Sequence, residues 1–100
     1  MLLIIKMILL KITKSNKNDK KYMAIFEGIN GRKTVHFGSE GYSDFTIHKD
    51  EERKARYIAR HKENENWRDP YAAGTLSRFI LWNKPTLNES IKDYKKRFNL

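Results

Sequence analysis

The 100-residue sequence contains no cysteine. Its absence excludes a disulfide framework and any metal site built on thiolates, and it fits a reducing compartment. The sequence also has no run of five like charges, which argues against a disordered basic tail. No apolar stretch approaches the about 20 residues that a membrane-spanning helix needs. We therefore expect no membrane partner.

The first ten residues are apolar except for Lys6 and superficially suggest a signal peptide. No basic residue precedes the apolar run, however, and no small-residue cleavage site follows it. We interpret residues 1–6 as an N-terminal extension and Met7 as an alternative start of the chain.

No catalytic motif is evident. His36, His48 and His61 do not have the spacing of metal ligands. No serine has the context of a nucleophile elbow, and no glycine-rich phosphate loop is present. A nuclease built on His48, His61 and Asn64 finds no support in their order and spacing. We expect a protein that is not an enzyme and that has no metal, no cofactor and no small-molecule substrate.

What the sequence does have is positive charge and aromatic side chains. The formal net charge is +9, and two Trp, five Tyr and five Phe supply most of the area available for a core. A length of 100 residues favours a single domain (1–100) with a modest core. The surplus of positive charge makes a polyanion the first partner to consider.

The patterning predicts an α+β fold. Three β-prone runs, 8–13, 22–27 and 33–37, are separated by polar or glycine-containing connectors, and Asn30-Gly31 is a hairpin signal in which both residues accept positive φ. We expect a small N-terminal antiparallel three-stranded sheet, a meander over residues 7–37, packed against two or three C-terminal helices. In the loop 38–48 that follows, we expect Phe37, Tyr42 and Phe45 to cap one end of the sheet rather than stack on bases.

The helical half is expected over residues 49–98. Asp50, Glu51 and Glu52 suit a helix N-terminus, and a second, short helix begins around 72–75. Thr86 with Glu89 forms a capping box before a third helix. The stripe Leu87, Ile91, Tyr94 and Phe98 should close the core against Ile25, Phe26 or Val35.

Several local sequences resemble a known family. They are Gly-Tyr-Ser-Asp-Phe-Thr (41–46), His-Lys-Asp (48–50), Arg-Lys (53–54), Arg-His-Lys (60–62) and Leu-Trp-Asn-Lys-Pro-Thr-Leu (81–87). The chain from Tyr22 to Phe98 is similar to small basic proteins of unknown function encoded by large nucleocytoplasmic DNA viruses of protists, mimivirus-like and algal-virus-like. The segment 1–6 departs from that pattern.

The resemblance implies a viral protein made in the host cytoplasm or viral factory and packaged in the virion. It supplies no catalytic residues to carry over to this chain.

A cationic surface is the main candidate site. Arg53, Arg56 and Arg60 recur at helical spacing and form a stripe that suits phosphates. We predict non-specific, non-enzymatic binding to the phosphate backbone of nucleic acid. The predicted contact residues are Arg53, Lys54, Arg56, Arg60, Arg68, Arg78, Lys92, Lys95, Lys96 and Arg97.

Two alternatives stay open. The stripe also fits an ordinary solvated helix face, held by pairs such as Glu52 with Arg56. The alternative for the whole chain is a structural virion protein, a minor capsid or core adaptor that acts through protein–protein contacts, because arginine and aromatic residues are enriched at interfaces. Trp67 and Trp82 suit base stacking, although the apolar neighbours of Trp82 favour its burial.

Overall fold

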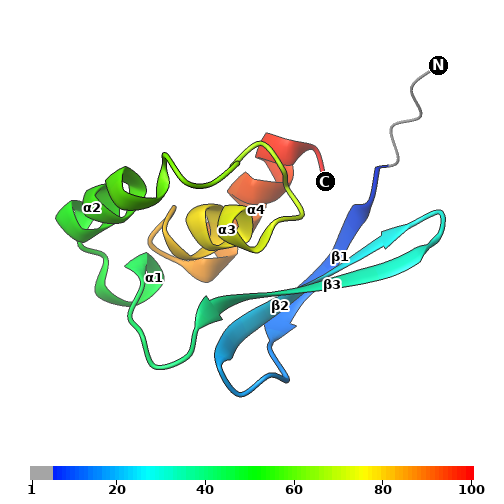
Figure 1. Ribbon diagram of the computed structural model, residues 1–100, viewed down its shortest axis with the longest axis horizontal. Helices are drawn as coiled ribbons and strands as arrows, with labels where there is room; N and C mark the ends of the chain where they lie inside the picture. Colours follow the sequence, from blue (N-terminus) through cyan, green and yellow to red (C-terminus); the bar gives the residue numbers. More distant parts are fainter. Residues whose placement is uncertain (1–5) are drawn as a thin grey trace.

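The computed structural model describes residues 6–100 and has the predicted α+β arrangement. The extension proposed at residues 1–6 falls, apart from Lys6, outside the described residues. An antiparallel sheet comes first in the chain and the helices follow (Figure 1). The elements are β1 (Ile8–Lys14), β2 (Lys20–Gly28), β3 (Gly31–Ser39), α1 (Phe45–His48), α2 (Glu51–His61), α3 (Ala73–Leu76), the π-helical segment η1 (Ser77–Leu81) and α4 (Leu87–Phe98).

The sheet has the strand order β1-β2-β3, with every neighbouring pair antiparallel. Side chains alternate between its two faces. One face buries Ala24, Phe26 and Phe37 in the core, together with Leu9 of β1. A register shift between Leu9 and Lys11 interrupts the pairing of β1 with β2.

The hairpin between β2 and β3 differs from the prediction in one respect. Gly28 pairs with Gly31, so Ile29 and Asn30 form the loop. Asn30 does not adopt positive φ, whereas Gly31 has a φ of 120°. The loop therefore starts one residue earlier than the Asn-Gly signal indicated, and glycine alone supplies the left-handed conformation.

The helical half contacts the sheet mainly through α3 and η1. Segment α3 lies against β3, and η1 continues it to bury Phe79, Ile80 and Leu81. The stripe on α4 reaches the core as predicted, with Tyr94 fully buried, but α4 packs mainly on η1 rather than on the sheet. Ile25 was wrongly included among its partners, because the alternation of β2 turns that side chain to the face opposite Ala24 and Phe26.

The segment after β3 is more structured than a loop. Strand β3 extends to Ser39, and Phe45–His48 forms the short helix α1 because the Asp44 carboxylate accepts from the backbone N–H of Thr46 at 2.9 Å. Phe37 and Phe45 are buried as expected, but Tyr42 is 74% exposed and caps nothing.

Candidate nucleic-acid interface

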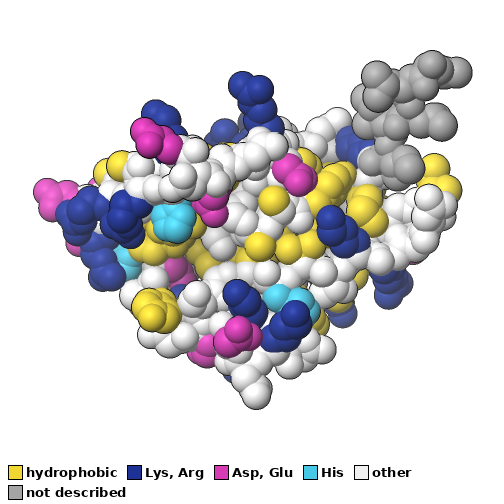
Figure 2. Space-filling view, in the orientation of Figure 1, with side chains coloured by type: hydrophobic (Ala, Val, Ile, Leu, Met, Phe, Trp, Pro, Cys, Tyr) yellow, Lys and Arg dark blue, Asp and Glu magenta, His cyan; other side chains and the backbone are white. Residues whose placement is uncertain are grey.

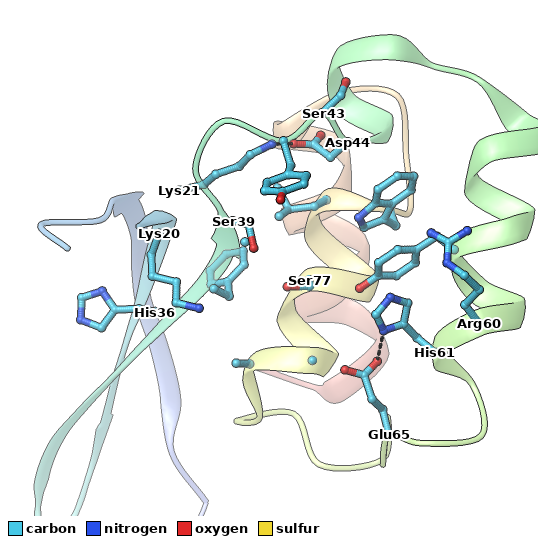
Figure 3. A pocket seen from close by; sticks show the side chains of 18 of the residues that line it. Lys20, Lys21, His36, Ser39, Ser43, Asp44, Arg60, His61, Glu65 and Ser77 are labelled. Carbon is cyan, nitrogen blue, oxygen red and sulfur yellow. Dashed lines mark hydrogen bonds and ion pairs between the residues drawn. The ribbon is translucent and has the colours of Figure 1, made fainter. Parts of the chain in front are cut away.

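A groove of about 500 Å³ lies between the end of the sheet and helix α2 (Figure 3). Strands β2 and β3 and the following loop form one wall, α2 forms the other, and α3–η1 forms the floor. The polar and aromatic side chains that line it are Lys20, Lys21, His36, Phe37, Ser39, Tyr42, Ser43, Asp44, Arg53, Tyr57, Arg60, His61, Glu65, Ser77 and Trp82.

Helix α2 brings four of these side chains to one wall. Its start is fixed by Asp50, whose carboxylate accepts from the backbone N–H groups of Glu52 and Arg53 at 3.0 and 3.3 Å. Residues three or four apart lie on the same face of a helix. Tyr57 is four residues from both Arg53 and His61 and three from Arg60, so these side chains share one face of α2. Tyr57 is the one buried residue of α2, so the contacts of this aromatic side chain set how the helix sits over the groove.

A stack of rings anchors that wall. Tyr57 lies parallel to Trp82, with ring centroids 4.3 Å apart and an interplanar angle of 5°. His61 covers the other face of Tyr57 at 4.2 Å. Burial, with a smaller effect from Glu65, raises the pKa of Tyr57 far above its usual range. The phenol is therefore neutral at ordinary pH and does not repel an anion in the groove.

The opposite wall is held by a buried ion pair. Lys21 Nζ lies 2.6 Å from Asp44 Oδ2, and both side chains are almost fully buried. Gly38 allows this wall to approach the floor: it has a φ of 79°, and a Cβ built there would lie 2.7 Å from Leu81 Cδ1. On the sheet itself, His36 Nδ1 lies 2.7 Å from the hydroxyl of Ser15.

The two acidic residues of the groove are already engaged. Asp44 pairs with Lys21, while Glu65 lies 3.4 Å from His61 Nδ1 and accepts from the indole N–H of Trp67 at 3.2 Å. Within residues 6–100, no acidic partner lies within ion-pair distance of Lys20, Arg53 or Arg60. The groove therefore has a surplus of positive charge, and Figure 2 shows Lys and Arg side chains gathered around α2 beside it.

The predicted arginine stripe divides between two environments. Arg53 and Arg60 line the groove, whereas Arg56 lies outside it and approaches Glu52 at 3.9 Å, the pair that the sequence had suggested. Lys54 faces inward: its ammonium donates to the carbonyl of Asn83 at 2.9 Å and lies 4.7 Å from the centre of the Phe45 ring. Lys54 thus ties α2 to the corner before α4.

Two further predicted arginines are also used within the molecule. Arg78 is half-buried between aromatic rings and donates to the carbonyl of Trp82 at 2.8 Å. Burial, and then the nearby Arg97, lower the pKa of Arg78. Arg97 forms an ion pair with Asp93 at 3.2 Å and lies over the ring of Phe79.

The remaining predicted cations are exposed. Lys92, Lys95 and Lys96 lie on α4, and Arg68 lies in the connection that precedes α3. Lys95 and Lys96 also stand in the last turn of α4, where positive charge stabilises the helix dipole. An ordinary solvated surface explains the positions of these side chains as well as phosphate binding does.

Sequence reasoning missed Lys20, Lys21, His61 and Tyr42 as groove residues. The spacing of Arg53, Tyr57 and Arg60 could have suggested one mixed face on α2, because these positions differ by four and three residues. Nothing in the sequence, however, indicates that Lys20 faces that helix. Lys20 and α2 come close together because α3 packs on β3 and α2 packs on Trp82.

Neither a metal site nor a membrane span is found in the part of the chain that the structure describes. No three of the described histidine, aspartate and glutamate side chains cluster as metal ligands would. Among residues 6–100, every helix is too short or too polar to cross a bilayer.

These features define a small α+β protein with a concave cationic groove walled by stacked aromatic rings. The family of unknown function DUF5754 matches residues 10–61, and the chain belongs to this family. The matched segment contains β2, β3, α1, α2 and all but the first two residues of β1, and hence both walls of the groove. Comparisons with curated proteins and with solved structures give no match.

Proposed function

We propose that this protein binds the phosphate backbone of nucleic acid, without catalysis, through the groove between the sheet and α2. The observation that carries the proposal is the presence of Lys20, Arg53 and Arg60 around one concavity whose two acids are occupied by internal partners. Ammonium and guanidinium groups without acidic partners are available to phosphate oxygens. Serine hydroxyls at positions 39, 43 and 77 add donors that do not depend on base sequence.

The test is a binding titration with a labelled oligonucleotide over a series of salt concentrations. The variant Arg53→Gln/Arg60→Gln removes two charges from the groove. The logarithm of the association constant decreases linearly with the logarithm of the salt concentration. If both side chains contact phosphates, the magnitude of this negative slope for a single strand should decrease by about 1.4. The matched control, Lys92→Gln/Lys95→Gln, removes two exposed charges from α4.

We expect the groove variant to bind much more weakly than the control at equal net charge. Equal losses in the two variants would mean that binding follows overall charge rather than the groove. Absence of binding by the unmodified protein even at low salt would refute the proposal.

We also propose a viral setting, supported by the resemblance of residues 22–98 to proteins of large DNA viruses of protists. The protein would then be made in the host cytoplasm or viral factory and packaged with nucleic acid in the virion. A proteomic inventory of purified particles tests packaging directly, since a protein confined to the infected cell would be missing from it.

One observation favours the second candidate function, a structural virion protein. A shallow hollow on α2, separate from the groove's lining, is lined by Ala55, Ile58 and Ala59 together with the charged Lys62 and Glu63. A partly apolar surface of this kind suits a protein partner. An adaptor should co-purify in fixed stoichiometry with a virion protein and resist salt, whereas nucleic-acid binding should weaken steeply as salt rises.

A further inference from the structure

The groove contains an aromatic side chain that the protein's own packing does not use. Tyr42 lines the groove and is 74% exposed. The other tyrosine and the tryptophan of the lining are stacked on each other. Among the described residues, no ring packs against Tyr42. The adjacent Gly41, with a φ of 87°, places Tyr42 at a sharp turn after β3.

We infer that the groove takes single-stranded nucleic acid, with Tyr42 as the platform on which one base stacks while Arg53 and Arg60 hold the flanking phosphates. This inference rests on the proposed function and specifies its ligand. Aromatic side chains beside a cationic groove are the general means by which proteins bind unpaired strands, because every base offers a π-face.

The shape of the site favours a single strand over a duplex. A helix that reads a duplex enters the major groove, which is about 12 Å wide, and presents its outward side chains to the bases and phosphates. In α2 the arginines without acidic partners, Arg53 and Arg60, line a concavity of the protein instead. The outward side of α2 carries instead the exposed Ala55 and Ala59, and Arg56 near Glu52. That side of the helix therefore offers little to the bases and phosphates of a duplex.

The size of the groove agrees with this assignment. A volume of about 500 Å³ falls in the range of about 300–1,000 Å³ that small ligands occupy, and it suits an unstacked nucleotide. A duplex keeps its bases paired and stacked, so none would reach Tyr42 without first being extruded. Only an unpaired strand satisfies the aromatic and the cationic side chains together.

The experiment compares a labelled 12-nucleotide oligothymidine with a 12-base-pair duplex, using the full chain. Tyr42→Leu should weaken binding of the single strand about tenfold and leave duplex binding unchanged. Tyr42→Phe keeps the ring and should bind like the unmodified protein. Ile47→Ala serves as the control, because Ile47 is a nearby exposed apolar residue outside the groove.

Three results would overturn the inference. The first is a Tyr42→Leu variant with unchanged affinity for the single strand, and the second is a preference of the unmodified protein for the duplex. The third is that free thymidine monophosphate displaces the labelled oligothymidine as well as unlabelled oligothymidine does at the same nucleotide concentration. In each of these cases, continued dependence on Arg53 and Arg60 would leave the proposed function standing. Loss of all binding at low salt would instead remove both.

Discussion

At the scale of single residues, the ion pair of Lys21 with Asp44 fixes one wall of the groove. The two side chains are buried, with Nζ and Oδ2 2.6 Å apart, and Asp44 also caps α1. Asp44→Asn keeps a capping oxygen but leaves the Lys21 ammonium without its counter-ion. Because removing one partner of a buried pair is costly, we predict a loss of about 3 kcal/mol in the free energy of unfolding, measured with urea.

The control for this prediction is Asp19→Asn, which removes the same charge from an exposed position. Its free energy of unfolding should stay within about 0.5 kcal/mol of the unmodified protein. A similar, small effect of Asp44→Asn would show that the pair contributes little to the fold.

The surroundings of His48 predict the sign of a pH dependence in the stability of the fold. The backbone N–H of Asp50 donates to His48 Nδ1 at 2.9 Å, so the folded state uses the neutral ring. Burial and then the charge of Arg53 lower the pKa of His48 below 6.5, against the opposing effect of Asp50. As the pH falls through 6.5, the unfolded chain takes up this proton before the folded protein does, and the free energy of unfolding decreases.

We therefore predict that the urea midpoint of unfolding decreases as the pH is lowered from 7.5 to 5.5. The His48→Gln variant should show a smaller decrease. Glutamine offers an oxygen as an acceptor but does not titrate. If the midpoint of the unmodified protein rose on acidification over this range, the direction assigned to His48 would be wrong.

At the scale of elements, the corner between η1 and α4 joins three parts of the helical half. The side-chain amide of Asn83 donates to the backbone carbonyl of Phe79 at 3.1 Å and to the carboxylate of Asp93 at 2.6 Å. The backbone carbonyl of Asn83 accepts from the Lys54 ammonium. Burial alone would raise the pKa of Asp93, but hydrogen bonds from Asn83 and Arg97 outweigh it and lower that pKa.

Asn83→Ala should lower the free energy of unfolding by about 2 kcal/mol, because it removes the amide that donates to the Phe79 carbonyl and to the Asp93 carboxylate, which then keeps only Arg97 as a side-chain donor. Asn88→Ala, at an exposed position on α4, is the matched control and should have little effect. Equal stabilities of the two variants would contradict the role given to this corner.

Most elements could be predicted from local patterns. Alternation identified the strands, while the acidic residues 50–52 and the Thr86 cap indicated the starts of α2 and α4. Helix α1 was missed because it is a single turn that depends on the side chain of Asp44. The π-helical form of Ser77–Leu81 was also missed, since the same apolar spacing fits an ordinary helix.

At the scale of the whole molecule, the site was only partly predictable. Helical spacing indicated Arg53 and Arg60 because they lie on one element. It also grouped Arg56 with them, whereas Arg56 lies outside the groove near Glu52, because helical spacing does not show which side of a helix faces the fold. The contributions of Lys20 and Tyr42 depend on contacts between distant segments, as do the internal contacts of Lys54 and Arg78.

The proposed function requires that phosphate binds in the groove and not over the cationic surface at large. Amide chemical shifts of the isotope-labelled protein, followed during titration with oligothymidine, test it most directly. We predict that the largest changes fall at residues 20–21, 39–44 and 53–61. Changes concentrated at residues 92–97 of α4, with the groove amides unmoved, would contradict the account.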